Sequence, residues 1–124
     1  MKHLHFDVET ASFYGAYWAC AGGSSCAVIA MIGDDPEDRL ARSAAKWLGA
    51  RGVNILTMSP AKKDYGHHNY PLERVETAIS WLKANGNKKI GIAGASTTGT
   101  LALTAAAMFP AVSYTHLRAH ETTL

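Results

Sequence analysis

Hydrophobic and polar residues alternate at the start of the chain, and continuous apolar runs follow later. In residues 1–10, Leu4, Phe6 and Val8 alternate with polar positions, and this period of two predicts a half-buried strand. A second, aromatic-rich strand is predicted over residues 14–21, with a Gly/Ser turn at residues 22–25 after it. Strands with one polar face are typical of antiparallel sheets, so these two segments predict an opening hairpin.

Three later apolar runs predict strands that are buried on both faces, at residues 26–32, 53–58 and 88–95. A segment with helical periodicity separates the first two of these runs. This first helix is predicted to begin at Pro36 with Asp35 as its N-cap, and to end at Gly49. Its predicted buried face consists of Leu40, Ala44, Trp47 and Leu48.

A second helix is predicted between the later two strands, from Pro71 to Gly86. Its predicted apolar face consists of Leu72, Val75, Ile79 and Leu82. Strands and helices that alternate in this way require right-handed crossovers. The pattern therefore predicts an α/β fold, a three-layer parallel sheet with helices on both faces, preceded by an antiparallel strand pair.

The third central strand runs directly into Gly94-Ala95-Ser96-Thr97-Thr98-Gly99, and a segment of helical character ends at Pro110. A serine on a tight strand-to-helix turn has the geometry of a nucleophile elbow, where helix N–H groups face a developing negative charge. The second glycine comes one residue later than in G-x-S-x-G. Two interpretations of Ser96 therefore stay open, a nucleophile and a small turn residue or helix N-cap. Gly99 is followed by Thr100, not lysine, which argues against a phosphate-binding P-loop.

Composition narrows the function classes. The chain has 124 residues, 48% hydrophobic and 18% charged, with a formal net charge of +2. This composition is typical of a globular domain and gives no sign of nucleic-acid binding, a membrane span or a signal peptide, so a cytoplasmic location is expected. Cys20 and Cys26 are expected to be free, buried thiols. His67 and His68 are interpreted as a polar loop, and neither a metal nor a cofactor is expected.

Four motifs carry a family resemblance across residues 26–110: EDRLA at 37–41, WLGARGV at 47–53, PLE at 71–73 before AISWL at 78–82, and IGIAGAS at 90–96. The chain resembles the α/β-hydrolase superfamily, and most resembles the catalytic domain of the acyl-CoA thioesterase and bile acid-CoA:amino acid N-acyltransferase family. The resemblance implies that Ser96 attacks an acyl ester or acyl-CoA thioester. It also implies an oxyanion hole formed by the backbone N–H groups of Thr97 and Asp34.

The C-terminal residues lack the periodic pattern found in the rest of the chain. Residues 112–122, VSYTHLRAHET, resemble the translation of a transposon-based sequencing adapter, so residues 112–124 are expected to be a non-native tail. His116, His120 and Glu121 are therefore not assigned to a catalytic triad. Residues 1–111 are then expected to form the N-terminal part of a single hydrolase domain.

In the α/β-hydrolase pattern the acid and the histidine follow the serine in the chain. They are therefore expected to lie outside this sequence, which would leave the fragment itself inactive and residues 90–93 as an unpaired strand edge. Two alternatives stay open. One is a Rossmann-like nucleotide-binding domain that uses the loop from Gly94 to Gly99, and the other is a non-catalytic interaction module with the hydrolase fold.

Overall fold

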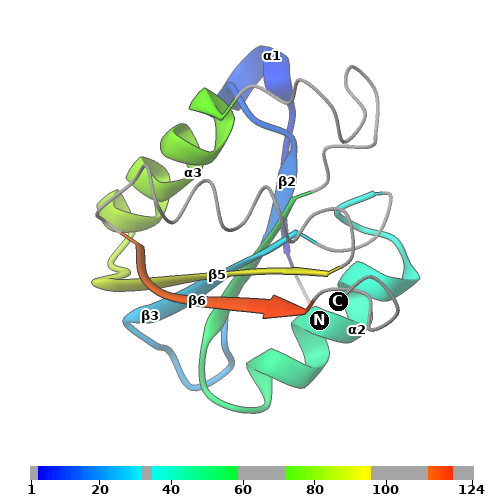
Figure 1. Ribbon diagram of the computed structural model, residues 1–124, viewed down its shortest axis with the longest axis vertical. Coiled ribbons are helices and arrows are strands. Elements are labelled where there is room, and N and C mark those ends of the chain that lie inside the picture. The colour runs from blue at the N-terminus through cyan, green and yellow to red at the C-terminus, as the bar shows by residue number, and fades with distance from the viewer. Residues whose placement is uncertain (1–2, 32–34, 59–71, 96–111, 119–124) are drawn as a thin grey trace.

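The computed structural model describes residues 3–31, 35–58, 72–95 and 112–118 of the 124-residue chain (Figure 1). The described residues form one mixed sheet with the strand order β1-β2-β4-β3-β5-β6. Its strands are β1 (Leu4–Phe6), β2 (Gly15–Trp18), β3 (Cys26–Met31), β4 (Asn54–Met58), β5 (Lys89–Ala95) and β6 (Val112–Arg118). Its helices are α1 (Val8–Ala11), α2 (Arg39–Gly49) and α3 (Glu73–Ala84).

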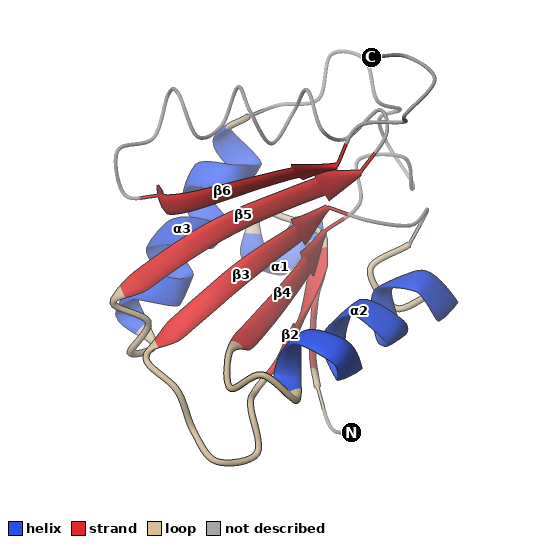
Figure 2. Ribbon diagram, turned by 60° about the horizontal axis from the view of Figure 1, so that its bottom comes forward, coloured by secondary structure: helices blue, strands red, loops and turns tan. Residues whose placement is uncertain are grey.

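The sheet combines an antiparallel opening with a parallel centre. β1 pairs with β2 and β2 with β4 in antiparallel register, whereas β3 is parallel to both β4 and β5. Figure 2 shows α2 on one face of the sheet and α3 on the other. The predicted α/β fold, its opening hairpin and its two crossover helices are therefore confirmed.

Alternating side chains of the central strands supply two separate cores. On the α3 face, Ile29 and Ile92 pack with Val75 and Leu82 in a cluster whose members are almost fully buried. On the α2 face, a smaller cluster contains Ala30, Ala45 and Ile55, together with two buried residues of β2. Because both faces are covered, most positions of these strands are apolar, as the continuous runs predicted, and the buried polar residues of β4, Asn54 and Thr57, form hydrogen bonds.

Helix α3 ends where the sequence predicted. It buries Val75, Ala78, Ile79 and Leu82, whereas Leu72, before its first turn, is only partly buried. Gly86 has a φ of 90°, a left-handed conformation that favours glycine and allows the chain to turn toward β5.

The N-terminal segment differs from its predicted form. β1 has only three residues, and the chain then forms the single helical turn α1, closed by hydrogen bonds from Ala11 N to Asp7 O (2.8 Å) and Ser12 N to Val8 O (3.0 Å). This local turn reverses the chain, so that Phe13 becomes buried against Phe6. Leu4 is 55% exposed, so the prediction of one alternating strand over residues 1–10 was wrong.

Helix α2 differs both in its cap and in its buried face. The N-cap is Asp38, whose Oδ1 accepts a hydrogen bond from Ala41 N (2.9 Å), and the predicted cap Asp35 lies in the preceding turn. Ala41 and Ala45 are buried, whereas Leu40 and Trp47 are 59% and 57% exposed.

The prediction that Trp47 belongs to the core was therefore wrong. The buried face of α2 is centred on Ala41 and Ala45, and of the predicted face Leu48 packs against the same cluster as Ala45. The Trp47 ring instead lies under the guanidinium of Arg51, with its centroid 3.6 Å from the Arg51 Cζ.

Strand β5 is not an edge strand. β6 pairs with it in parallel register, with an irregularity between Ile90 and Gly91, so the expectation of an unpaired edge at residues 90–93 was wrong. The non-native origin of residues 112–124 stays a prediction. Cys20 and Cys26 are free, as expected, but both are partly exposed rather than buried.

Gly15 marks a close approach between β2 and β4. A Cβ at this position would lie 2.7 Å from the backbone carbonyl oxygen of Thr57, which cannot rotate away. We expect Gly15→Ala to lower the free energy of unfolding by about 1–3 kcal/mol, measured as the midpoint of urea denaturation. Gly22→Ala is the matched control because a Cβ there would contact nothing within 4 Å. Equal midpoints for the two variants would contradict the steric argument.

Candidate functional site

The candidate site lies at the carboxyl edge of the central strands. β3 and β5 are parallel neighbours, and Met31 at the end of β3 is opposite Gly94 near the end of β5. The chain leaves β3 after Met31 and β5 after Ala95, so the segments that carry Asp34 and Ser96 start side by side at one edge. Ser96, Thr97 and Asp34 themselves lie outside the described residues.

This edge is also where the direction of the chain connections changes. From β3 the chain passes through α2 to β4 on one side, and from β4 it passes through α3 to β5 on the other side of β3. The two helices lie on opposite faces (Figure 2). In open α/β sheets, ligands bind in the crevice at such a topological switch point. The strand order therefore favours this edge independently of the serine motif.

Side-chain hydrogen bonds stabilise the turn before α2 at the same edge of the sheet. The Tyr14 hydroxyl donates a hydrogen bond to Asp35 Oδ2 (3.2 Å), and Asp35 Oδ1 accepts one from Glu37 N (2.9 Å). Burial, helped by the carboxylate of Asp35, raises the pKa of Tyr14 to about 12, so Tyr14 stays a protonated donor near neutral pH. The carboxylate of Asp35 is thus held by two donors rather than by the helix it was predicted to cap.

Thr57 connects the same turn to the sheet. Its Oγ1 accepts a hydrogen bond from Trp18 Nε1 (3.0 Å) and lies 2.6 Å from the carbonyl oxygen of Pro36. All of Thr57 is buried. The sequence alone predicts no role for Thr57, because a threonine in an apolar strand is explained by β propensity alone.

Two histidines of the N-terminal segment also reach this turn. Both His3 and His5 bond to the carboxylate of Glu37, and His5 bonds to Asp7 as well. His3 also stacks on Trp18, with ring centroids 4.1 Å apart. Both side chains stay in contact with solvent, at 18% exposure for His3 and 39% for His5, as expected for polar positions of an alternating segment, and both have defined carboxylate partners.

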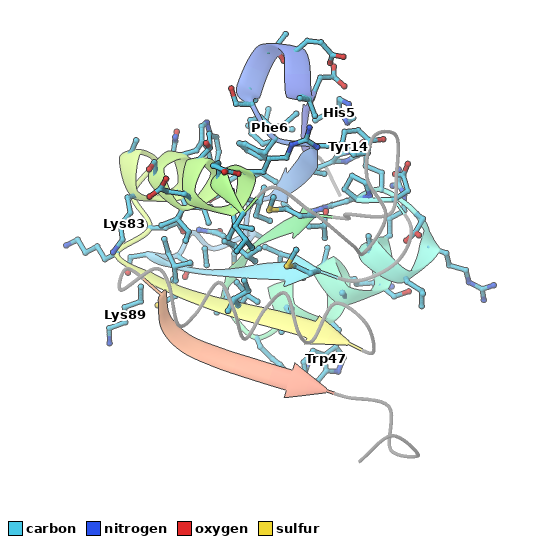
Figure 3. The ribbon with its side chains drawn as sticks, turned by 45° about the horizontal axis from the view of Figure 1, so that its top comes forward. His5, Phe6, Tyr14, Trp47, Lys83 and Lys89 are labelled. Carbon is cyan, nitrogen blue, oxygen red and sulfur yellow. The ribbon has the colours of Figure 1, made fainter. Side chains whose placement is uncertain are left out.

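A pocket of about 360 Å³ lies at the opposite end of the sheet. It is lined by residues at the amino ends of β3 and β5, among them Cys26, Val28, Lys89 and Gly91. The carboxyl edge is at the other end of these strands, so this pocket is separate from the candidate site. Figure 3 shows Lys89 at the end of the molecule away from His5 and Tyr14.

Within the described part of the chain, no group of three or more His, Cys, Asp or Glu side chains could hold a metal ion. His67 and His68 fall outside that part. A search of the same residues finds no helix that is long and apolar enough to cross a membrane.

Comparison with known proteins agrees with this architecture. The chain is similar to the crystal structure of the alpha/beta hydrolase GrgF from Penicillium sp. sh18, with a TM-score of 0.72 and 22% sequence identity. The similarity covers 94% of this chain and 44% of that chain, so this chain spans less than half the length of the solved structure. No protein-family model and no curated protein matches the chain.

The fold is therefore that of an α/β hydrolase, present here in part. No family model or curated protein supports the finer resemblance to acyl-CoA thioesterases and N-acyltransferases.

Proposed function

We propose that the complete protein from which this chain comes is a serine-dependent acyl hydrolase or acyltransferase, with Ser96 as its nucleophile. The observation that supports the proposal is the end of β5 at Ala95, at the topological switch point of the sheet, because Ser96 is the next residue in the sequence. This is where a strand-to-helix turn would hold a hydroxyl above the sheet edge.

The chemistry assigned to the site follows from this position. The Ser96 oxygen attacks the acyl carbonyl of an ester or acyl-CoA thioester while its proton passes to a general base, and the alcohol or thiol leaves. Water or an amine then releases the acyl group. The backbone N–H groups of Thr97 and Asp34 are proposed to stabilise the tetrahedral oxyanion.

The network around Asp35 supports the second of these donors. An acidic turn beside an oxyanion hole would oppose the developing negative charge unless its carboxylates were engaged elsewhere. The Asp35 carboxylate accepts hydrogen bonds from Tyr14 and from the backbone of Glu37. Its charge is therefore partly compensated.

The general base and its carboxylate partner are proposed to come from sequence beyond this chain. A serine hydroxyl without its base is a weak nucleophile, and loss of a triad member costs about 10⁴- to 10⁶-fold in rate. We therefore propose that the 124-residue chain alone is inactive.

Covalent labelling tests the proposal. In the complete protein a fluorophosphonate probe should modify Ser96, as located by peptide mass spectrometry, and should block hydrolysis of an activated ester. Labelling of a different serine would place the nucleophile elsewhere. Tight nucleotide binding without labelling would favour the Rossmann-like alternative. If the protein shows neither labelling nor nucleotide binding, the non-catalytic interaction module is favoured.

A further inference from the structure

A pair of histidines and a pair of carboxylates join the N-terminal strand to the turn before α2. His5 Nδ1 lies 2.7 Å from Glu37 Oε1, and His5 Nε2 lies 2.9 Å from Asp7 Oδ1. His3 contacts the other oxygen of the same Glu37 carboxylate. We call His3, His5, Asp7 and Glu37 the histidine clasp. It links residues that are more than thirty positions apart in the chain.

The geometry of His5 favours its protonated form. A neutral imidazole has one N–H donor and one bare nitrogen, and an ionised carboxylate can only accept. Both ring nitrogens of His5 face carboxylate oxygens at hydrogen-bond distance. A neutral ring would therefore leave one nitrogen lone pair against an oxygen lone pair. Only the imidazolium donates to Asp7 and Glu37 together, and its charge also attracts both.

Other groups around the clasp fix its position. The His5 ring meets the edge of Tyr14, whose hydroxyl bonds to Asp35, with ring centroids 5.6 Å apart. Figure 3 shows His5 and Tyr14 together at this end of the molecule. Arg42, from α2, donates from Nε to the carbonyl oxygen of Glu37 (2.8 Å), and its guanidinium lies over the Trp18 ring on which His3 stacks.

We propose that the histidine clasp is a proton-dependent latch, in which protonated His5 holds β1 on the turn that leads into α2 and neutral His5 releases it. The turn is coupled to the first turn of α2, because Asp38 belongs to the turn and is also the N-cap of the helix. Release would therefore loosen β1 and the start of α2 together. The latch goes beyond the proposed acyl chemistry and does not depend on it.

The electrostatics of the clasp agree with its geometry. The hydrogen bond to Asp7 is the largest influence and raises the pKa of His5 above the ordinary 6.5. Partial burial opposes this shift, and Glu37 adds to it. Folded protein then binds this proton more tightly than the unfolded chain. The stabilisation is complete below about pH 6.5 and is lost as the pH rises through the pKa of the folded state.

Titration of the intact 124-residue chain tests the latch. We expect the NMR titration midpoint of the His5 ring to lie above 6.5 in the wild-type chain and to fall in Glu37→Gln and in Asp7→Asn. The melting temperature should rise as the pH falls from about 8 to about 6, and His5→Gln should abolish most of this rise.

Glu76→Gln is the control, since it removes one carboxylate from an exposed position of α3. It should leave both the His5 midpoint and the pH dependence of melting unchanged. A His5 midpoint at or below 6.5 in the wild-type chain would overturn the latch, even if His5→Gln failed to fold. A pH dependence that survives in folded His5→Gln would overturn it equally.

Discussion

Replacement of Ser96 by alanine in the complete protein should reduce turnover of activated esters or acyl-CoA thioesters by about 10⁴-fold or more. The reason is that the acyl-enzyme pathway needs the Ser96 oxygen as its nucleophile. Without it, only binding and oxyanion stabilisation remain to promote direct attack by water. Loss should appear in kcat rather than in KM, since the hydroxyl acts mainly in the transition state.

A matched control separates chemistry from folding. Ser80→Ala makes the same substitution at an exposed position of α3, away from the carboxyl edge. It should keep wild-type turnover, and both variants should melt at the wild-type temperature. Retained turnover in Ser96→Ala would place the nucleophile elsewhere, and Ser96-dependent turnover by the 124-residue chain alone would contradict its proposed inactivity.

The central strands were predictable because burial on both faces requires a continuous apolar run. The observed ends of β3, β4 and β5 all lie within one residue of the predicted ends. Helix α3 was predictable for a related reason, since it has a single apolar stripe and a glycine at its end.

Helix α2 shows where pattern alone is insufficient. Its stripe with Leu40 and Trp47 is more hydrophobic than its stripe with Ala41 and Ala45, yet the alanines contact the sheet. Hydrophobicity ranks the larger side chains as core, whereas the way the helix packs on the sheet decides which residues are buried. That packing is a property of the assembled layers and is not encoded within the helix.

The neighbouring strands β3 and β5, which end at the edge of the candidate site, could be predicted from the sequence, whereas the residues that support this edge could not. A serine at the end of a central strand can be recognised from the order of elements along the chain. The contacts of Tyr14 with Asp35 and of His5 with Glu37 join segments that are distant in sequence. No local pattern contains both partners, so such contacts emerge only when the sheet brings β1, β2 and the turn before α2 together.

At the amino end of the sheet, a buried amide network holds together segments from three regions of the chain. Asn54 accepts a hydrogen bond from Cys20 N (2.8 Å) and donates to the Ser24 carbonyl (3.0 Å) and to Asn87 Oδ1 (2.8 Å). Asn87 in turn donates to the carbonyl oxygen of Leu82 (3.1 Å). Asn54 and Asn87 are 4% and 1% exposed, so water cannot replace a lost partner easily.

Asn54→Ala should therefore lower the free energy of unfolding by about 2–5 kcal/mol, because it leaves several buried polar groups without partners. Guanidinium denaturation followed by circular dichroism measures the change. Asn85→Ala is the control, since Asn85 is exposed and its side chain donates to the carbonyl oxygen of Trp81 in its own turn, and it should cost about 0.5 kcal/mol or less. Asn54→Asp keeps the volume but removes two donors. It should be about as unstable as Asn54→Ala near neutral pH, whereas wild-type stability in Asn54→Asp would show that packing volume and not hydrogen bonding holds this end of the sheet together.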